Sequence, residues 1–507
     1  MDTYDVAILG AGPGGYVAAI RGAQLGAKVC VIERDEVGGA CLNRGCIPTK
    51  TLIASVRALE KVRSGGEYGF EIEGDAAAHF DRMMGRKDEV VGRQVKGIQS
   101  LFRSYGVRLR YGAGRLIDPH TVEIMSPAGS KDRLGAEKIV LATGSRPAGI
   151  AGVTVDGEAV LSSDEALTLR EVPKSLLIIG AGAIGCEFAS IFRALGSEVT
   201  MVELLPRAVP MEDEEISRTV ERELRKQKIR LLVRTSVESL QQRSEGGVTA
   251  RLSDGREIAA ERVLVSVGRA FNVQGIGLEA IGIDQGQRGE ILVNGKMETS
   301  VQGIYAIGDV VGGVMLAHVA SREGIVAVEN ALGGDERIDY SAVPACIFSH
   351  PEIASVGLKE REAVEKGFGV KVGRFQMRGL GMAHALGELS GFVKVVADAD
   401  TDKILGAHMI GAHATEMVHQ AVLALQTGLT AREWAKMIHA HPTMSEALQE
   451  AVHDLHGTAI HLPPKERHQG DPRIHKSPIN FNRPRLFEDH WQDPIHPPLA
   501  FETPFDP

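Results

Sequence analysis

The chain has 507 residues, of which 43% are hydrophobic and 24% are charged, as in soluble globular proteins. Its formal net charge of −9 gives no general attraction to nucleic acid or to an anionic membrane. No apolar run approaches the roughly 20 residues that span a bilayer. The strand pattern that begins at MDTYDVAILG leaves no room for a signal peptide. We therefore expect a cytoplasmic protein that binds neither nucleic acid nor membrane, with about three or four domains.

The first 33 residues predict a strand–helix–strand unit that binds a dinucleotide. Residues 4–10 (YDVAILG) have the pattern of a buried strand, residues 14–25 that of a helix, and residues 28–33 that of a second strand. A G-x-G-x-x-G turn between the first strand and the helix allows a pyrophosphate to approach the helix N-terminus. Glu33 ends the second strand, where a carboxylate can bond a ribose hydroxyl. The alternative is a glycine-rich turn without function. The glycines of the motif are Gly10, Gly12 and Gly15.

Two cysteines, Cys41 and Cys46, follow this unit closely. In a regular helix, residues five apart have Cα atoms roughly 8–9 Å apart, whereas a disulfide needs about 4.4–6.8 Å. A bridge therefore requires a local distortion, which Gly45 and Pro48 are suited to flank. Pro48 also favours a helix start, so the dipole there would lower the pKa of the Cys46 thiol. Two buried free cysteines or half a zinc site remain alternatives to a redox pair.

Residues 107–118 and 121–126 alternate like strands, and VLATGSRP at 140–147 reads as a strand leaving a domain. Near Ser175 the strand–turn–helix–strand order recurs, about 170 residues after its first occurrence, which predicts a second dinucleotide-binding domain. Its terminal acid, Glu203, would accept bonds from a free 2′-hydroxyl and repel a 2′-phosphate. This favours NAD over NADP, although Arg207 lies close by. The glycines of the second motif are Gly180, Gly182 and Gly185.

The stretch GIYAIGDV at 303–310 predicts another strand that runs into glycine and aspartate. From Tyr340 the pattern becomes α+β, with strands such as FVKVVAD followed by helices. Within this part, His441 and Glu446 could form a base and its orienting carboxylate, because a dithiol enzyme needs a base for the substrate thiol. An ordinary capped helix start is the alternative.

The fold class is α/β, with two Rossmann-like domains and a C-terminal α+β domain. The predicted regions are 1–148, 149–270, 271–339, 340–462 and 463–507.

The last region, residues 463–507, is rich in proline and histidine and has no clear periodicity. Its prolines predict an extended, largely irregular path. Aromatic residues between the prolines favour a segment that docks in surface grooves over a purely solvating tail. The irregular spacing of its histidines favours solvated side chains over a metal site, and we predict no metal elsewhere. The five aromatic residues are Phe481, Phe487, Trp491, Phe501 and Phe505.

Together these residues resemble the pyridine nucleotide–disulfide oxidoreductase family over about residues 2–462. GGACLNRGCIPTKTL at 38–52 is similar to the redox-active segment of members that oxidise dihydrolipoyl groups, and GIYAIGDV is similar to the second FAD motif. MLAHVASREG at 315–324 is similar to the flavin-contacting stretch, and HAHPTMSEA at 439–447 to the C-terminal signature. Four ordered matches are far more specific than any one of them.

The resemblance implies that Cys41 is the interchange thiol and that Cys46 lies beside the flavin in a charge-transfer complex. It implies that Lys50 lies by the isoalloxazine and pairs with Glu187. Asp309 would contact the ribityl–phosphate region of FAD. His441 and Glu446 would complete the site of the partner subunit. Other residues that the resemblance assigns to cofactor binding are Gly144, Gly268 and Ala317.

The resemblance implies a homodimer that uses FAD and NAD. Its partners would be lipoyl domains of 2-oxo acid dehydrogenase or glycine cleavage complexes. The alternatives are another FAD-dependent disulfide reductase of the same fold and a catalytically silent flavoprotein scaffold. Glu203 argues against an NADPH-dependent glutathione reductase, and the lack of any cysteine after Cys346 argues against a mercuric reductase.

Overall fold

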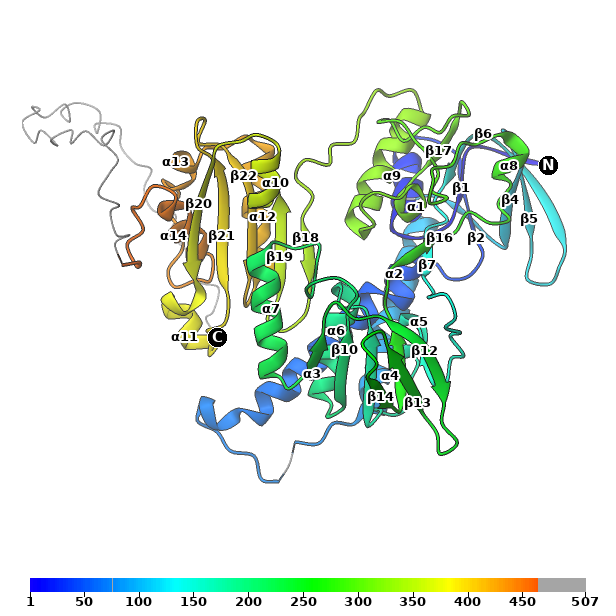
Figure 1. Cartoon of the computed structure of the whole chain (residues 1–507). Coiled ribbons are helices and arrows are strands. Elements are labelled where there is room, and N and C mark those ends of the chain that lie inside the picture. Colours follow the sequence, from blue (N-terminus) through cyan, green and yellow to red (C-terminus); the bar gives the residue numbers. More distant parts are fainter. Residues whose placement is uncertain (75, 464–507) are drawn as a thin grey trace, which may run out of the picture. The chain divides into compact units, whose positions relative to one another are not determined.

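The computed structural model describes residues 1–74 and 76–463. Residues Met1–Leu462 form one compact unit, in which the main β-sheets each have their own helices (Figure 1). The predicted fold class is confirmed, because a mixed sheet with parallel central strands and a second, fully parallel sheet precede an antiparallel sheet with helices. The predictions for the tail, including the aromatic anchors, concern residues 464–507 and lie outside the described residues.

The first sheet has the strand order β3–β2–β1–β6–β5–β4, and β17 also pairs with β6. Strand β1 lies between β2 and β6 and is parallel to both. Its apolar residues are buried, as expected for a central parallel strand. The strands are β1 (Asp2–Leu9), β2 (Val29–Glu33), β3 (Arg108–Tyr111), β4 (Ala113–Asp118), β5 (Thr121–Met125), β6 (Lys131–Leu141) and β17 (Ile304–Ala306).

Helices α1 and α9 pack closely together beside this sheet, although about 300 residues separate them in the sequence (Figure 1). Helices α2 and α3 follow β2 directly and are joined at Gly45. The helices of this part are α1 (Pro13–Gln24), α2 (Gly39–Arg44), α3 (Cys46–Arg63), α4 (Phe80–Ser104), α8 (Leu278–Ile281) and α9 (Ala317–Ala331), with short 3₁₀ turns η1 (Gly65–Tyr68) and η2 (Gly308–Val311).

The second sheet is parallel throughout, in the order β11–β10–β9–β15–β8. A small antiparallel sheet, β12–β13–β14, and the pair β7–β16 lie outside this sheet. The strands are β7 (Ser145–Pro147), β8 (Val160–Leu161), β9 (Ser175–Ile179), β10 (Glu198–Val202), β11 (Arg230–Leu232), β12 (Val237–Gln242), β13 (Val248–Leu252), β14 (Glu257–Ala260), β15 (Arg262–Val265) and β16 (Arg269–Phe271). The helices are α5 (Ser163–Ala166), α6 (Ala183–Ala194) and α7 (Glu214–Lys226).

The third sheet is antiparallel, in the order β18–β19–β22–β21–β20. Helix α12 packs on β19 and β22, and α14 packs on β20 and β21. The strands are β18 (Ala345–Ile347), β19 (Ile353–Gly357), β20 (Val370–Gln376), β21 (Phe392–Asp398) and β22 (Ile404–Ile410). The helices are α10 (Glu360–Glu365), η3 (Met377–Gly379), α11 (Gly381–Leu386), α12 (Ala414–Gln426), α13 (Ala431–Trp434) and α14 (Glu446–Asp454).

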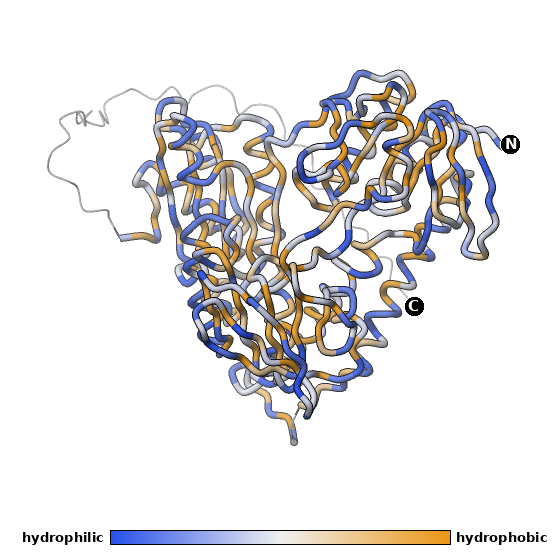
Figure 2. The backbone as a smooth tube through the Cα atoms, turned by 45° about the vertical axis from the view of Figure 1, so that its right-hand side comes forward, coloured by the Kyte–Doolittle hydropathy of each residue, from blue (hydrophilic) through white to orange (hydrophobic). Residues whose placement is uncertain are grey.

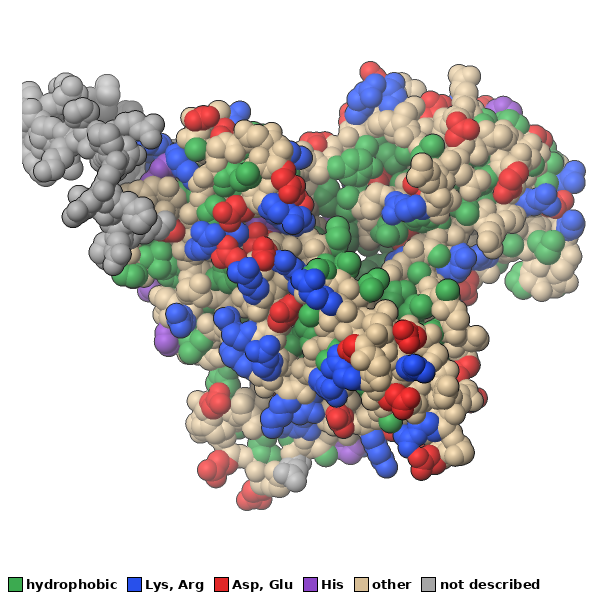
Figure 3. Space-filling view, viewed as in Figure 1, with side chains coloured by type: hydrophobic (Ala, Val, Ile, Leu, Met, Phe, Trp, Pro, Cys, Tyr) green, Lys and Arg blue, Asp and Glu red, His purple; other side chains and the backbone are tan. Residues whose placement is uncertain are grey.

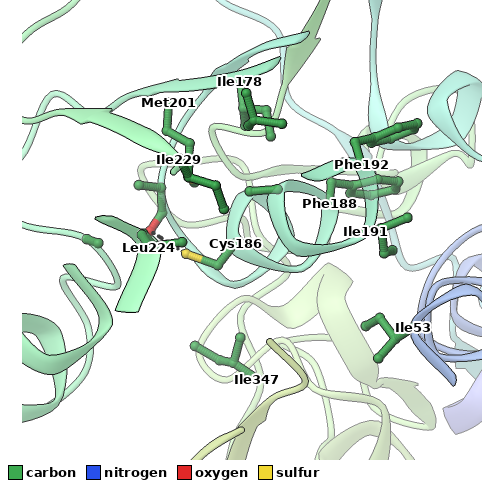
Figure 4. Close-up of a cluster of buried hydrophobic side chains, with 14 of the residues drawn as sticks. Ile53, Ile178, Cys186, Phe188, Ile191, Phe192, Met201, Leu224, Ile229 and Ile347 are labelled. Atoms are coloured by element: carbon green, nitrogen blue, oxygen red, sulfur yellow. Dashed lines mark hydrogen bonds between the residues drawn. The ribbon is translucent and has the colours of Figure 1, made fainter. Parts of the chain in front are cut away.

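The core consists of several apolar clusters, and the cluster around α6 joins elements that are distant in sequence. Hydrophobic residues are buried in the strands and helices of this core, and Figure 2 shows orange hydrophobic segments interleaved with blue hydrophilic ones along the backbone. Around α6, Ile53 of α3 and Ile347 of β18 belong to the same buried cluster as Phe188 (Figure 4). This cluster therefore holds the cysteine-bearing helix, the second nucleotide unit and the third sheet together.

On the face shown in Figure 3, acidic and basic side chains are interspersed. Within residues 1–74 and 76–463, no helix is long and apolar enough to cross a membrane.

Candidate functional site

The first glycine turn joins β1 to α1. A Cβ on Gly10 would lie 2.3 Å from the Ala142 carbonyl oxygen, and one on Gly15 would lie 2.0 Å from the Gly10 oxygen. These two glycines are therefore required by the turn itself. Gly12 differs, because a Cβ there would meet only the Gly39 Cα atom, at 3.9 Å. The space next to Gly12 is thus open at the N-terminus of α1, where backbone N–H groups favour an anion.

Glu33 lies at the end of β2 and is 7% exposed. Its carboxylate accepts hydrogen bonds from the Ala11 amide at 2.7 Å and from the Asp35 amide at 2.8 Å. Burial raises the pKa of Glu33 even though both amides favour the charged form. A carboxylate has about four acceptor positions, so Glu33 can hold the turn and still accept a ribose hydroxyl.

The second turn repeats this arrangement between β9 and α6. A Cβ on Gly180 would lie 2.5 Å from the Ser266 oxygen, and one on Gly185 would lie 2.0 Å from the Gly180 oxygen, whereas Gly182 has nothing within 4 Å. Glu203 accepts from the Ala181 amide at 2.7 Å and from the Leu205 amide at 2.8 Å. Both turns therefore leave their middle glycine free beside a helix N-terminus, which fits a dinucleotide in each.

Arg207 lies four residues after Glu203 in the sequence, and a free arginine at that place could bind the 2′-phosphate of NADP. In the structure its Nη1 atom forms an ion pair with Glu214 Oε1 at 3.0 Å. Arg207 is therefore already engaged by a carboxylate of α7. This pairing adds to the preference for a free 2′-hydroxyl.

Cys41 lies on α2 and Cys46 is the first residue of α3. The predicted distortion between them occurs at Gly45, whose φ of −142° and ψ of −109° interrupt the helix. Both residues are thiols here, and their side chains are hydrogen-bonded to each other. The bond from Cys41 and the charge of Lys50 lower the pKa of Cys46 to about 7 against the effect of burial. The same bond, together with burial, raises the pKa of Cys41.

Lys50 lies one turn after Cys46 and pairs with Glu187 of α6, as the resemblance implied. Its Nζ atom is 2.8 Å from Oε1 and 2.9 Å from Oε2 of the buried carboxylate. Glu187 also accepts from the Phe348 amide at 3.0 Å, and Lys50 Nζ lies 4.8 Å from the Phe348 ring centroid. The cation beside Cys46 is thus held by groups from α6 and from the segment after β18.

His441 and Glu446 form the pair that the sequence suggested. His441 Nδ1 is 2.9 Å from Glu446 Oε1, and Glu446 also accepts from the Thr443 amide at 2.9 Å. Although burial opposes it, these two bonds hold the pKa of Glu446 below its ordinary value. Nδ1 is therefore the protonated nitrogen in the neutral ring, and Nε2 is left as the base.

The His441 side chain is 76% exposed. Among residues 1–74 and 76–463 its hydrogen-bond partner is Glu446, and neither cysteine of the same chain bonds to it. Within the described residues, His441 therefore makes no hydrogen bond to the dithiol of its own chain.

Asp309 lies in η2 and accepts a hydrogen bond from Ser145 Oγ. Arg269 Nε lies 3.5 Å from the Asp309 carboxylate and donates to Ser145 Oγ at 2.6 Å. Gly144 directly precedes Ser145 of β7, and Gly268 directly precedes Arg269 of β16, and both glycines have a positive φ. These contacts bring together Asp309, Gly144 and Gly268. Ala317, the fourth predicted residue, is the first residue of α9. Sequence reasoning did not identify Ser145 or Arg269.

Glu323 was also missed, although it lies inside the MLAHVASREG stretch. It is 2% exposed and accepts from the Gly308 amide at 2.6 Å and from the Tyr340 hydroxyl at 2.7 Å. Burial raises the pKa of Glu323 to about 7. Its carboxylate fixes the glycine next to Asp309, a contact that no local pattern reveals.

The described residues contain no group of three or more His, Cys, Asp or Glu side chains placed to hold a metal ion.

The comparisons with known proteins agree with this geometry. Residues 4–324 match the model of the pyridine nucleotide-disulphide oxidoreductase family, and residues 343–452 match its dimerisation domain. Dihydrolipoyl dehydrogenase of Bacillus subtilis is 43% identical over 90% of this chain and 99% of its own length. Mitochondrial dihydrolipoyl dehydrogenase 1 of Arabidopsis thaliana is 40% identical over 91% of this chain and 92% of its own.

Among solved structures, LpdA of Mycobacterium tuberculosis superposes with a TM-score of 0.84 at 29% identity, covering 90% of this chain and all of its own. The HOCl-induced flavoprotein disulfide reductase RclA of Escherichia coli superposes with a TM-score of 0.79 at 27% identity, covering 89% of this chain and 99% of its own. The chain belongs to the pyridine nucleotide-disulphide oxidoreductase family.

Proposed function

We propose that this chain is a dihydrolipoyl dehydrogenase, which oxidises protein-bound dihydrolipoyl groups through Cys41 and Cys46 and uses FAD to reduce NAD⁺. The observation that carries the proposal is the pair of cysteines at the junction of α2 and α3, next to the Lys50–Glu187 ion pair, where the Cys41 thiol and the Lys50 charge lower the pKa of Cys46. The identity of 40–43% to dihydrolipoyl dehydrogenases over about nine tenths of the chain supports the choice of substrate.

The thiol chemistry follows from the two sites. A dihydrolipoyl thiol gives its proton to His441 Nε2, and the resulting thiolate attacks Cys41 Sγ of the oxidised pair. The Cys41–Cys46 bond breaks, and the electron pair leaves on Cys46, where the charge of Lys50 stabilises a thiolate. The second lipoyl thiol then attacks the lipoyl sulfur of the mixed disulfide, and its proton passes to the departing Cys41 sulfur. This forms the lipoyl disulfide and releases Cys41 as a thiol. FAD and NAD⁺, when bound, supply the two-electron acceptor chemistry.

Two sets of residues would hold the cofactors. For FAD, the open face of Gly12 and the carboxylates of Glu33 and Asp309 suit the phosphates, ribose and ribityl chain, and Lys50 suits the flavin ring. For NAD, Gly182 and Glu203 play the matching parts. The remaining proposed cofactor residues are Gly10, Gly15, Gly144, Ala317, Gly180, Gly185, Glu187 and Gly268.

We assign residues 1–148 to FAD binding, 149–270 to NAD binding and 271–339 to a central region that completes the FAD site. Residues 340–462 form the interface region, in line with the match to the family's dimerisation domain. The exposure of His441 supports a homodimer in which this residue serves the partner's dithiol. We further propose a cytoplasmic enzyme that serves lipoyl domains of 2-oxo acid dehydrogenase or glycine cleavage complexes.

Complementation between two inactive variants tests this proposal. Cys41→Ser should abolish lipoamide turnover but keep FAD bound, and His441→Gln should lower turnover by about 10²–10⁴, the usual contribution of a general acid–base. Heterodimers re-formed from the two variants should regain one working site. Verified heterodimers that stay inactive would place both residues in one subunit's site.

Two measurements on the wild-type enzyme separate dihydrolipoyl dehydrogenase from the alternative functions. NADH should bleach the FAD absorbance of the wild-type enzyme, and lipoamide should then be turned over. Bleaching without lipoamide turnover would favour another disulfide reductase of this fold. Failure of both would favour a silent flavoprotein scaffold.

A further inference from the structure

One face of α3 carries both the redox chemistry and a long-range contact. With about 3.6 residues per turn, residues four, seven and eleven positions after Cys46 return to the same helix face. These are Lys50, Ile53 and Arg57. Ile53 enters the buried cluster around α6 (Figure 4). Arg57 thus continues the face that begins with the dithiol.

Arg57 binds the segment between β18 and β19, residues 348–352, which we call the bridge segment. Its Nη1 atom donates to Glu352 Oε1 at 2.8 Å. Its Nη2 atom donates to the carbonyl oxygens of Ser349 at 2.8 Å and Phe348 at 3.3 Å. One planar guanidinium therefore fixes both ends of the bridge segment, which an ammonium group could not do with the same geometry.

The bridge segment is tied to two other parts of the molecule. Glu352 Oε2 accepts from Thr415 Oγ1 at 2.7 Å and from its amide at 3.2 Å, at the start of α12. Against the effect of burial, the bonds from Thr415 and Arg57 lower the pKa of Glu352. At the other end, the Phe348 amide donates to Glu187, and the Phe348 ring lies against Lys50. Arg57 is thereby connected to the charge pair beside Cys46 through Phe348.

We propose that Arg57 is a positioning residue for the redox site: by clamping the bridge segment to α3, it keeps Phe348 against Glu187 and so keeps the Lys50 ammonium beside Cys46. The proposal deepens the proposed function and rests on it for the role of Cys46. The charged and titratable groups that face Cys46 are Cys41 of α2, Lys50 of its own helix and Glu187 of α6. Arg57 acts on this set without touching the dithiol. The same clamp docks the region that carries His441 onto the redox helix.

The test measures the thiolate of Cys46 directly. The reduced, FAD-loaded enzyme is titrated across a pH series, and the Cys46 thiolate is read from its charge-transfer absorbance with the flavin. In the wild type, this absorbance should appear with a midpoint near pH 7. In Arg57→Ala the midpoint should rise by about one unit, because a displaced cation no longer favours the thiolate. Lipoamide turnover at pH 7 should fall roughly fivefold and recover above pH 8, as such a shift requires.

Matched variants separate the positioning role of Arg57 from a general effect on the stability of the protein. Arg63→Ala removes an arginine from the same helix whose contacts are the carbonyls of Ala194 and Ala76, so its midpoint should stay that of the wild type. In Arg57→Lys the Cys46 midpoint should rise less than in Arg57→Ala. If Arg57→Ala loses FAD, Glu352→Gln, which keeps the side-chain size, should give a smaller shift in the same direction.

A wild-type midpoint in both Arg57→Ala and Glu352→Gln would overturn the proposal. Because this readout needs no lipoyl substrate, it does not depend on which disulfide or dithiol the enzyme acts on. A wild type that fails to turn over lipoamide would instead refute that function while leaving the midpoint measurement intact.

Discussion

The two glycine turns have the same internal geometry but different surroundings. In the first, Gly14 lies under α9: a Cβ there would be 2.9 Å from the Ala320 carbonyl oxygen. A Cβ on Gly324 of α9 would in turn be 2.5 Å from the Gly14 oxygen. In the second turn the matching position is Ile184, so a large side chain is accommodated where the first turn has only a hydrogen. The backbone of the first turn is therefore in direct contact with a second helix, whereas in the second turn the Ile184 side chain packs against the cluster that α3 and α6 share.

This difference suits the two cofactors. A turn closed by α9 favours a group that stays bound through many turnovers, as FAD does in the proposed cycle. A turn without that close backbone contact favours a nucleotide that enters and leaves, as NAD does in the proposed cycle. The shared motif thus supplies phosphate recognition in both places, and the neighbouring helix decides how freely the ligand exchanges.

The largest expected effect comes from filling the open space at each middle glycine. Gly12 and Gly182 have extended backbones, with φ of −67° and −77°, so alanine is tolerated by the fold itself. Gly12→Ala should lose FAD and with it all redox turnover. Gly182→Ala should keep FAD and raise the KM for NAD by about tenfold, or about 1.4 kcal/mol. Flavin absorbance per chain and steady-state kinetics measure the two effects. Full FAD content in Gly12→Ala would contradict the assignment of the first turn.

A smaller effect is expected where α9 meets the first turn. Gly14→Ala should destabilise the protein by about 1–3 kcal/mol, the usual cost of overpacking, because both α9 and Ile307 would have to move. Thermal unfolding and the rate of FAD release check this. Ile184→Ala, the matched change in the second turn, should leave the rate of FAD release unchanged. Equal FAD release in both variants would mean that α9 does not retain the cofactor.

The smallest effect concerns the choice of nucleotide. Glu214→Ala removes the partner of Arg207 and frees a guanidinium near the second site. The kcat/KM for NADPH should rise a few-fold while NADH stays preferred, because Glu203 remains. Glu214→Gln serves as the control for side-chain size. An unchanged NADPH value in both variants would remove Arg207 from the account of specificity.

Much of the fold could be predicted because it depends on local signals. The strand–turn–helix units around Gly10 and Gly180 and the helix start at Cys46 follow from short motifs. Helices α4, α7 and α9 and the sheet β12–β13–β14 were not predicted. Strand β13 alternates buried and exposed residues over only five positions, which is a weak pattern, and α4 has few buried residues along its 25 positions.

The residues of the site also divide into those that local motifs predict and those that only the tertiary fold brings together. Cys41, Cys46, Lys50 and the His441–Glu446 pair lie within short stretches that resemble family motifs. Arg57 and Glu352 are 295 residues apart and meet only through packing of α3 against the third sheet. A lone arginine on a helix and a lone glutamate before a strand give no local sign of each other. Such contacts become visible only when the tertiary fold is known.

The exposure of His441 has a consequence for how activity depends on concentration. An isolated chain would hold FAD and its dithiol but would lack the base that the partner provides. Specific lipoamide turnover should then fall as the protein is diluted below the dissociation constant of the dimer, and it should return when the solution is concentrated again. NADH oxidation by artificial acceptors, which needs no His441, should stay constant per chain over the same range. In the proposed function, catalysis is thereby coupled to assembly, because the residue that would receive the first proton belongs to the partner of the chain whose cysteine is attacked.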